Sequence, residues 1–310
     1  MKLRDFPNDF QDLAAIVAAE LHIPESAVRR DYDIVALLAQ LADSPYGELC
    51  VFKGGTALSK CYPGSIDRFS EDIDLTYLGM EQTDKECDRA IKRIEETMTL
   101  EANTEKIAGE RSKRSKSMYV WFDEPTERVK LEIGSSVRPD PYAAKEIKSY
   151  IHEYLERRGL TDAIQDYGLR PVTLNTLGIE RTFVDKLMAV KRHAICGTLA
   201  QKVRHIYDVK QLYRLPEIRA FLHDDTELKR LLRLTKETDS YYLDKRGISE
   251  DYDPLGPYSF SDWESCLDGT VRSNYEKLHE TLLFTDEKQE LDEAIRVFGE
   301  LSERFKELGE

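Results

Sequence analysis

The chain has 310 residues, 41% of them hydrophobic and 34% charged, which is enough apolar material for an ordinary core and excludes a wholly disordered protein. A mean hydropathy of -0.54, with no apolar run of about 18 residues, excludes a protein that spans a membrane by helices. The five cysteines lack C-x-x-C spacing, which indicates reduced thiols and neither a zinc site nor a disulfide framework. Because the first residues do not resemble a signal peptide, we expect a cytoplasmic protein.

The net charge of -14 by itself argues against a nucleic-acid-binding protein. Two segments differ from the rest, since residues 181–214 carry a net charge of +6 and residues 106–116 one of +4. A local field matters more to a polyanionic ligand than the total charge, so both segments are candidates for contacts with RNA. Solvated helix faces and a loop would give the same pattern.

The first 140 residues mix helical and strand patterns. Apolar spacing predicts a helix over 8–22 and a second one that follows Pro24 and ends near Asp43. The next predicted elements are a strand over 49–52, a helix over 56–60, a strand over 73–78, a helix over 84–100, and strands over 118–122 and 128–137. This order indicates an α/β or α+β domain.

The rest of the chain has an almost entirely helical pattern. Helices are predicted over 143–158, 180–195, 200–213, 215–223, 226–245 and 286–308, with one strand over 172–174 and a loop over 246–262. We therefore expect two domains, with residues 1–140 forming the sheet domain and residues 141–310 forming a mainly helical one.

A glycine pair lies between the first predicted strand and the helix after it. Gly54 and Gly55 allow backbone N–H groups to approach an anion closely, and the helix that continues through Thr56 adds its positive end. The segment is not a Walker A loop, and a tight turn would also explain the glycines. Ser70, which lies two residues before Asp72, could cap the loop, contact a nucleotide phosphate or be modified.

Three carboxylates fall on predicted strands. Asp72 and Asp74 share one face of a strand because side chains alternate, and two adjacent carboxylates repel each other unless a cation such as magnesium lies between them. Glu132 lies opposite the apolar residues of its own strand, and it joins the two aspartates if the two strands are neighbours. Three such carboxylates can hold the two magnesium ions of a nucleotidyl transfer. A solvent-facing glutamate and a chance D-x-D remain as alternatives.

Two residues of the helical half complete the candidate site. Lys186 lies beside an apolar stripe and can reach a phosphate as a point charge. Asp208 lies among cationic neighbours that would keep it ionised. A surface lysine and an intrahelical pair between Asp208 and Arg204 are the structural alternatives.

The motifs together resemble the AbiEii/AbiGii toxin family of nucleotidyltransferases, in the DNA polymerase β-like nucleotidyltransferase superfamily. The resemblance is specific over residues 52–75, extends through Glu132 and 181–191, and ends near 204–210. It implies an α+β fold, with a mixed sheet and flanking helices followed by a larger helical domain. The site residues that it implies are Gly54, Gly55, Thr56 and Ser70 for the nucleotide, Asp72, Asp74 and Glu132 for metal and catalysis, and Lys186 and Asp208 from the helical half.

The resemblance implies a magnesium-dependent enzyme that moves NMP from an NTP to a hydroxyl of RNA, with tRNA as the expected acceptor. Such an enzyme would be the toxin of a type IV-like toxin–antitoxin or abortive-infection pair, with a cognate antitoxin as partner. A small-molecule nucleotidyltransferase of the antibiotic-modifying kind shares the metal motif but needs an acidic pocket for a cationic acceptor. A non-catalytic nucleotide-binding module is the third hypothesis, and the presence of all three carboxylates disfavours it.

Overall fold

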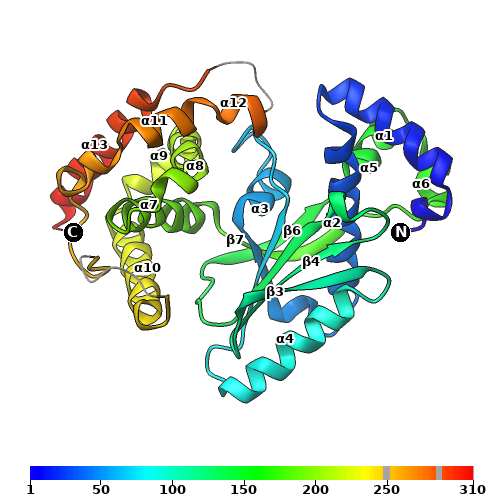
Figure 1. Cartoon of the computed structure of the whole chain (residues 1–310), viewed down its shortest axis with the longest axis horizontal. Coiled ribbons are helices and arrows are strands. Elements are labelled where there is room, and N and C mark those ends of the chain that lie inside the picture. The colour runs from blue at the N-terminus through cyan, green and yellow to red at the C-terminus, as the bar shows by residue number, and fades with distance from the viewer. Residues whose placement is uncertain (247–251, 284–287, 310) are drawn as a thin grey trace. The chain divides into compact units, whose positions relative to one another are not determined.

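The computed structural model describes residues 1–246, 252–283 and 288–309, and the chain divides into two compact units (Figure 1). The first unit contains Met1–Pro63 and Phe69–Leu177, and the second contains Gly64–Arg68 and Gly178–Glu310. The short segment Gly64–Arg68 therefore joins the helical unit before the chain returns to the sheet. In the part of the chain that is described, no helix has the length and apolar character needed to cross a membrane.

The first unit is built on a mixed sheet of seven strands in the order β3-β4-β5-β2-β1-β7-β6. Its strands are β1 (Cys50–Lys53), β2 (Asp72–Tyr77), β3 (Asn103–Arg111), β4 (Ser115–Trp121), β5 (Val129–Gly134), β6 (Tyr142–Ile147) and β7 (Val172–Leu177). The pairs β2–β5 and β1–β7 are parallel and the other pairs are antiparallel. A mixed sheet with many helices is the α+β architecture that the sequence predicts.

The alternation of side chains along each strand decides which face of this sheet packs into the core. Ile73 and Leu75 of β2 and Leu131 of β5 are buried in one cluster with residues of two helices, α2 (Glu25–Ala42) and α4 (Asp84–Met98). The residues between them along each strand therefore project from the opposite face. The other helices of this unit are α1 (Pro7–Leu21), α3 (Gly54–Cys61), α5 (Tyr150–Arg157) and α6 (Thr161–Asp166).

The second unit is helical. Its helices are α7 (Ile179–Ile195), α8 (Arg204–Tyr213), α9 (Pro216–Leu222), α10 (Asp225–Arg246), α11 (Gly269–Glu276), α12 (Leu278–Thr281) and α13 (Leu291–Leu308). The apolar stripe of α13 is buried, and Phe298 packs against Trp263 and Phe260 with ring centroids 5.6 and 5.8 Å apart. This aromatic cluster fixes the last helix to the unit.

Several predicted boundaries are wrong. Residues 143–158, predicted as one helix, form β6 and then α5, and the basic loop over 106–116 contains most of β3. Both strands lie at sheet edges and are mostly exposed, so they lack the alternating apolar pattern that marks a half-buried strand. Because β6 and β7 complete the sheet, residues 141–177 belong to the first unit, which makes that unit the longer one and moves its boundary from 140 to Leu177.

Other predictions agree with the structure more closely. The helices over 8–22, 84–100 and 180–195 are confirmed to within two residues at each end. The strand over 172–174 is confirmed and continues to Leu177. The predicted loop over 246–262 and helix over 286–308 lie partly outside the described residues, at 247–251 and 286–287.

Candidate active site

Three carboxylates lie on one face of the sheet, opposite the core. Asp72 and Asp74 alternate along β2 with buried Ile73 and Leu75. Asp74 is the direct cross-strand partner of Glu132 in the parallel pair β2–β5. This pairing is the condition on which the prediction for Glu132 depended, so the backbone brings the three carboxylates to adjacent positions.

Glu132 is held by a lysine of its own strand. The Lys130 Nζ lies 2.5 Å from Glu132 Oε1 and 2.8 Å from Glu110 Oε2, while 40% of the Glu132 side chain is exposed. Partial burial lowers the pKa of Lys130, but the two carboxylates outweigh burial and raise this pKa above its ordinary value. Lys130 therefore remains protonated and supplies the positive charge beside Glu132.

The residues of this face fit a hard divalent cation in their chemistry. Asp72, Asp74 and Glu132 offer only carboxylate oxygens, the donors that magnesium prefers. Within 1–246, 252–283 and 288–309, however, no three or more His, Cys, Asp or Glu side chains gather closely enough to hold a metal ion. Since Lys130 holds Glu132, this glutamate has to turn from the lysine to join the two aspartates.

Gly54 lies directly against Asp74. Its φ of +84° is one that other residues rarely adopt, and a Cβ built on it would lie 2.1 Å from Asp74 Oδ2. Gly54 is the first residue of α3, and the preceding residue, Lys53, pairs with Asp74 across β1 and β2. The glycine is therefore required both for the backbone conformation and for space beside the carboxylate.

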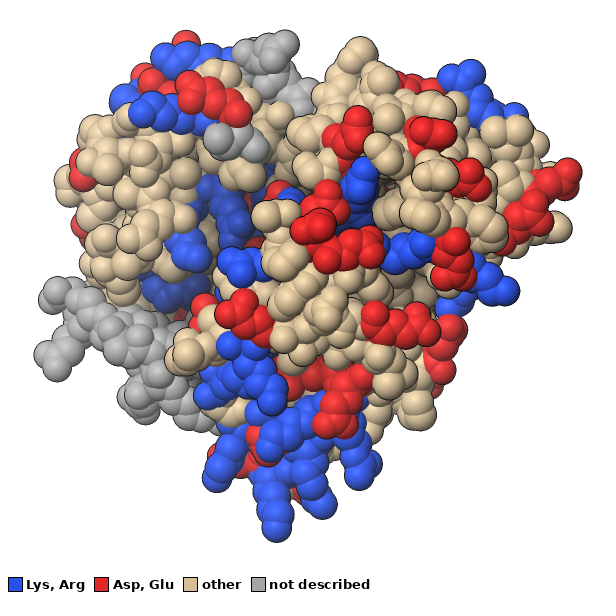
Figure 2. All heavy atoms as spheres, turned by 45° about the vertical axis from the view of Figure 1, so that its right-hand side comes forward, with Lys and Arg blue, Asp and Glu red and all other residues tan. Residues whose placement is uncertain are grey.

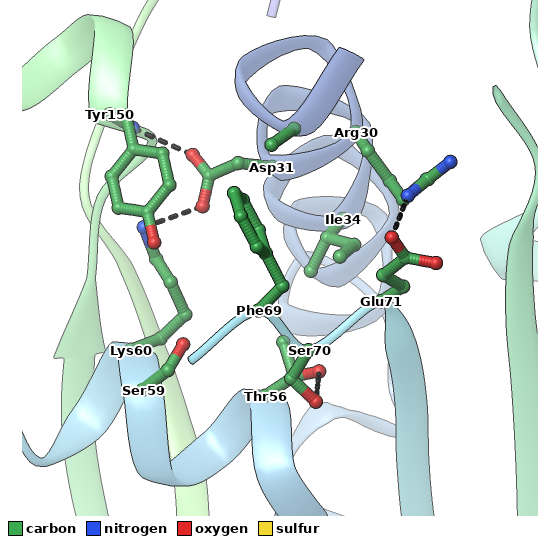
Figure 3. A pocket seen from close by; sticks show the side chains of 11 residues that line it. Arg30, Asp31, Ile34, Thr56, Ser59, Lys60, Phe69, Ser70, Glu71 and Tyr150 are labelled. Carbon is green, nitrogen blue, oxygen red and sulfur yellow. Dashed lines mark hydrogen bonds and ion pairs between the residues drawn. The ribbon is translucent and has the colours of Figure 1, made fainter. Parts of the chain in front are cut away.

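Thr56 connects α3 to the segment that enters β2. Its hydroxyl donates to the Asp72 carbonyl oxygen at 2.5 Å and lies 3.0 Å from the Ser70 hydroxyl (Figure 3). Thr56 is buried, as is Gly55, which precedes it in the first turn of α3. The Thr56 side chain therefore positions Asp72, and the first turn of α3 leaves backbone N–H groups without intrahelical partners.

A small cavity next to Thr56 is lined by paired charges (Figure 3). Lys60 Nζ lies 2.8 Å from Asp31 Oδ1 and 4.1 Å from the centroid of the Tyr150 ring, and Asp31 also accepts the Tyr150 N–H at 2.6 Å. Burial raises the pKa of Asp31 although Lys60 opposes this effect. On the other side, Arg30 pairs with Glu71. The pairs connect α3 with α2 and α5.

The second unit contains a buried cluster around Asp208. Arg68 forms a two-pronged contact with this carboxylate, with Nε 2.6 Å from Oδ1 and Nη2 2.8 Å from Oδ2, and Lys186 Nζ lies 2.6 Å from Oδ2. The prediction singled out Lys186 and Asp208, which the structure brings into contact. It gave no role to Arg68, although this residue lies in the segment 52–75 that carries the family resemblance.

Charge keeps the buried Asp208 ionised. Burial alone would raise its pKa, but Arg68 and Lys186 outweigh burial and hold the pKa well below its ordinary value. Burial lowers the pKa of Lys186 despite the attraction of Asp208, and it lowers that of neighbouring His205 well below its usual value. Asp208 is therefore the carboxylate that neutralises the buried side chains of Arg68 and Lys186.

The basic segment 181–214 is largely an interior feature. Arg181 pairs with Asp185, Lys191 donates to the Pro257 carbonyl at 2.8 Å, Arg192 pairs with Asp239, and Lys210 pairs with Glu293. These side chains are buried or half-buried, so they form neither a solvated helix face nor a surface that contacts RNA. The segment 106–116 behaves similarly, because three of its five cations pair with α4.

Comparison with known proteins places the chain in a family. A family model described as nucleotidyl transferase AbiEii toxin of type IV toxin–antitoxin systems matches residues 36–297. The chain belongs to the AbiEii nucleotidyltransferase family. As a member it is a nucleotidyltransferase, and the family uses an NTP and a divalent metal ion and implies an antitoxin partner.

One solved structure shows that the AbiEii chain shares a known fold. MenT4, a nucleotidyltransferase toxin from Mycobacterium tuberculosis, is 19% identical with a TM-score of 0.52, and the alignment covers 95% of this chain and 98% of MenT4. JHP933 from Helicobacter pylori is 17% identical with a TM-score of 0.39, over 83% of this chain and 95% of JHP933. A search of curated proteins finds no match.

We predict that Gly54→Ala abolishes nucleotidyl transfer, because the new methyl group would displace the Asp74 carboxylate. The matched control is Gly109→Ala, since Gly109 has φ +82° and open space where its Cβ would lie. Both variants have a similar backbone strain of about 1–2 kcal/mol, and only Gly54→Ala adds the overlap with Asp74, so urea unfolding of Gly109→Ala measures the strain alone. If Gly54→Ala is as active as Gly109→Ala, Asp74 is not needed in this position.

We predict that Asp208→Asn lowers the free energy of unfolding by about 3–5 kcal/mol, because it leaves two buried cations without their carboxylate. The folded-state pKa of Asp208 is lowered, so its contribution is present above the ordinary aspartate pKa and declines as the pH falls below it. Urea unfolding at neutral pH and near pH 3 measures this difference. Asp292→Asn, which breaks an exposed pair with Arg272, is the control and should change the free energy of unfolding little, because solvent screens an exposed pair. Equal losses of unfolding free energy in Asp208→Asn and Asp292→Asn would contradict the assignment of Asp208 as the partner of two buried cations.

Proposed function

We propose that this AbiEii-family chain is a magnesium-dependent enzyme that transfers NMP from an NTP to a hydroxyl of RNA, with tRNA as the expected acceptor, and that a cognate antitoxin restrains it. The observation that supports the proposal is the placement of Asp72, Asp74 and Glu132 on one sheet face, with Asp74 packed against Gly54. Lys130 supplies one cation to Glu132, and like carboxylates at neighbouring backbone positions favour the binding of a further cation.

Each residue of the sheet unit has a separate task in this proposal. Asp72 and Asp74, together with Glu132 once it leaves Lys130, would hold the magnesium ions. Two such ions would lower the pKa of the attacking hydroxyl and neutralise negative charge on the departing pyrophosphate. The N–H groups of the first turn of α3 would bind the triphosphate, with Thr56 and Ser70 holding the segment that leads into Asp72.

The helical unit contributes Lys186 and Asp208. The family resemblance implies that Lys186 would neutralise negative charge on the triphosphate. Both carboxylate oxygens of Asp208 are occupied, one by Arg68 and the other by Arg68 and Lys186, and the carboxylate is fully buried. This arrangement supports a positioning role for Asp208, in which it orients Lys186, over direct activation of the acceptor hydroxyl.

The cavity beside Thr56 disfavours a cationic small molecule as the acceptor. An antibiotic-modifying enzyme needs net negative charge around a cationic acceptor. In this cavity each acid has a cation as partner, Asp31 with Lys60 and Glu71 with Arg30. The cavity therefore offers a cationic acceptor no excess of negative charge.

The test is incubation of the protein with each α-labelled NTP, magnesium and total RNA, followed by separation of RNA from small products. We expect label in RNA from the wild-type protein. Asp72→Asn and Asp74→Asn should each lower the rate by at least about a thousandfold, since each removes a ligand of the ions that carry the chemistry. Thermal unfolding should show folded proteins that are as stable as the wild type or more stable, because carboxylate repulsion is relieved.

Asp162→Asn, which removes an exposed carboxylate on α6, is the control and should retain full activity. Wild-type turnover by either active-site variant at saturating magnesium would contradict the metal assignment. Label found only in small molecules would favour the antibiotic-type enzyme. Nucleotide binding without any labelled product would favour a regulatory module.

A further inference from the structure

The outer face of α4 carries a cluster of exposed cations. Lys85, Arg89, Lys92 and Arg93, which we call the basic face, are all exposed. Figure 2 shows Lys and Arg gathered at the lower end of the first unit, where Figure 1 places α4. Lys85, Arg89 and Arg93 follow one another at four-residue intervals and therefore form a stripe along the helix. This concentration of positive charge is unusual in a chain with a net charge of -14.

Three of the five acids of α4 do not neutralise this stripe, because they pair with cations of other elements. Asp84 pairs with Arg114 at 2.6 Å, Asp88 with Lys116 at 2.6 Å, and Glu95 with Arg111 at 2.8 Å. Glu86 accepts the Thr83 N–H at 2.9 Å as part of a capping box. Asp84, Asp88 and Glu95 thus neutralise the cations of β3, β4 and the turn between them. Glu86 and the exposed Glu96 are the two acids that remain beside the four cations of the basic face.

The cations of the stripe lack such partners. Among the ion pairs that the described residues form, none involves Lys85, Arg89 or Arg93, and only Lys92 shares Asp88. Arg89 and Arg93 also line a surface hollow, together with Tyr46, Tyr77, Gln82, Ala90 and one acid, Glu86. The basic face is therefore an open row of positive charge beside a polar and aromatic hollow.

We infer that the basic face binds backbone phosphates in the body of the RNA acceptor, an inference that rests on the proposed function and extends it to a second surface. The cations of the stripe are spaced by about 6 Å along the helix axis, close to the distance between successive phosphates in a nucleic-acid strand. A row of cations without acid partners fits a polyanion better than an acidic protein surface, whose carboxylates are irregularly spaced.

The location of the basic face defines its task. Residues of α4 share one buried cluster with Ile73 and Leu75, so α4 lies on the sheet face opposite Asp72 and Asp74. Tyr77, at the hollow, is also five residues along β2 from Asp72, or roughly 17 Å. The basic face therefore cannot touch the reacting hydroxyl. It binds a part of the RNA acceptor that lies far from the reacting hydroxyl, and this acceptor must be long enough to extend around the edge of the sheet.

The test compares Lys85→Gln/Arg89→Gln/Arg93→Gln with the wild type in binding to bulk tRNA, by fluorescence anisotropy over a series of salt concentrations without NTP. We expect a Kd at least about tenfold higher at low salt, and a slope of log affinity against log salt smaller by about two to three. Binding of a short 3′-terminal RNA oligonucleotide should not change. In transfer assays the KM for tRNA should rise, while kcat should not.

The matched control is Lys229→Gln/Arg233→Gln/Lys306→Gln, which removes three exposed cations and changes the net charge equally. It should bind tRNA like the wild type. If the stripe variant is unstable, Arg89→Gln alone should still lower the slope by about one.

An unchanged Kd and slope in the stripe variant would overturn the inference, as would equal losses in stripe and control variants. Loss of binding to an acidic protein with unchanged tRNA binding would assign the face to a protein partner and would equally overturn it. Because binding is measured without NTP, a wild-type protein that never labels RNA would instead contradict the proposed function.

Discussion

The candidate site of the first unit depends on strand alternation, which places two like charges on one face of the sheet. Strand alternation places Asp72 and Asp74 on the same face of β2, and parallel pairing with β5 places Glu132 beside them. Neighbouring parts of the structure accommodate this arrangement. Gly54 leaves space for the Asp74 carboxylate, Thr56 holds the Asp72 carbonyl, and Lys130 supplies a positive charge to Glu132. The unit therefore places three carboxylates at neighbouring backbone positions, where a nucleotidyltransferase needs cations.

The helical unit uses the opposite arrangement, one buried anion between two cations. Arg68, which belongs to this unit, is followed by three residues of the sheet unit and then by Asp72. The chain is thus held at both ends of this short segment, by Asp208 at one end and by Thr56 at the other. Disturbing either contact should affect the same carboxylate, although Asp208 and Thr56 belong to different units.

The sequence predicted the buried parts of the fold better than its edges. The periodicity of α1, α4 and α7 and the alternation of β2 identify elements that bury one face. β3 and β6 are exposed edge strands, and only backbone pairing with a neighbour defines them, which leaves no apolar pattern to detect. Spacing within β2 and β5 was enough to place the three carboxylates on strand faces, but not to show that Lys130 holds Glu132. The net charge of residues 181–214 did not predict a surface for RNA, because Lys191 and Lys210 are buried and paired with residues far along the chain.

The most direct test of the account is metal binding itself, measured by electron paramagnetic resonance with Mn²⁺ as the probe and a non-hydrolysable NTP analogue present. If Asp72, Asp74 and Glu132 form the cation site, the wild-type protein should bind Mn²⁺ in competition with magnesium. Asp74→Asn should bind it much more weakly, while Asp162→Asn should match the wild type. Equal Mn²⁺ affinity in the Asp74→Asn variant and the wild type would contradict the central claim that these carboxylates are held together to bind metal.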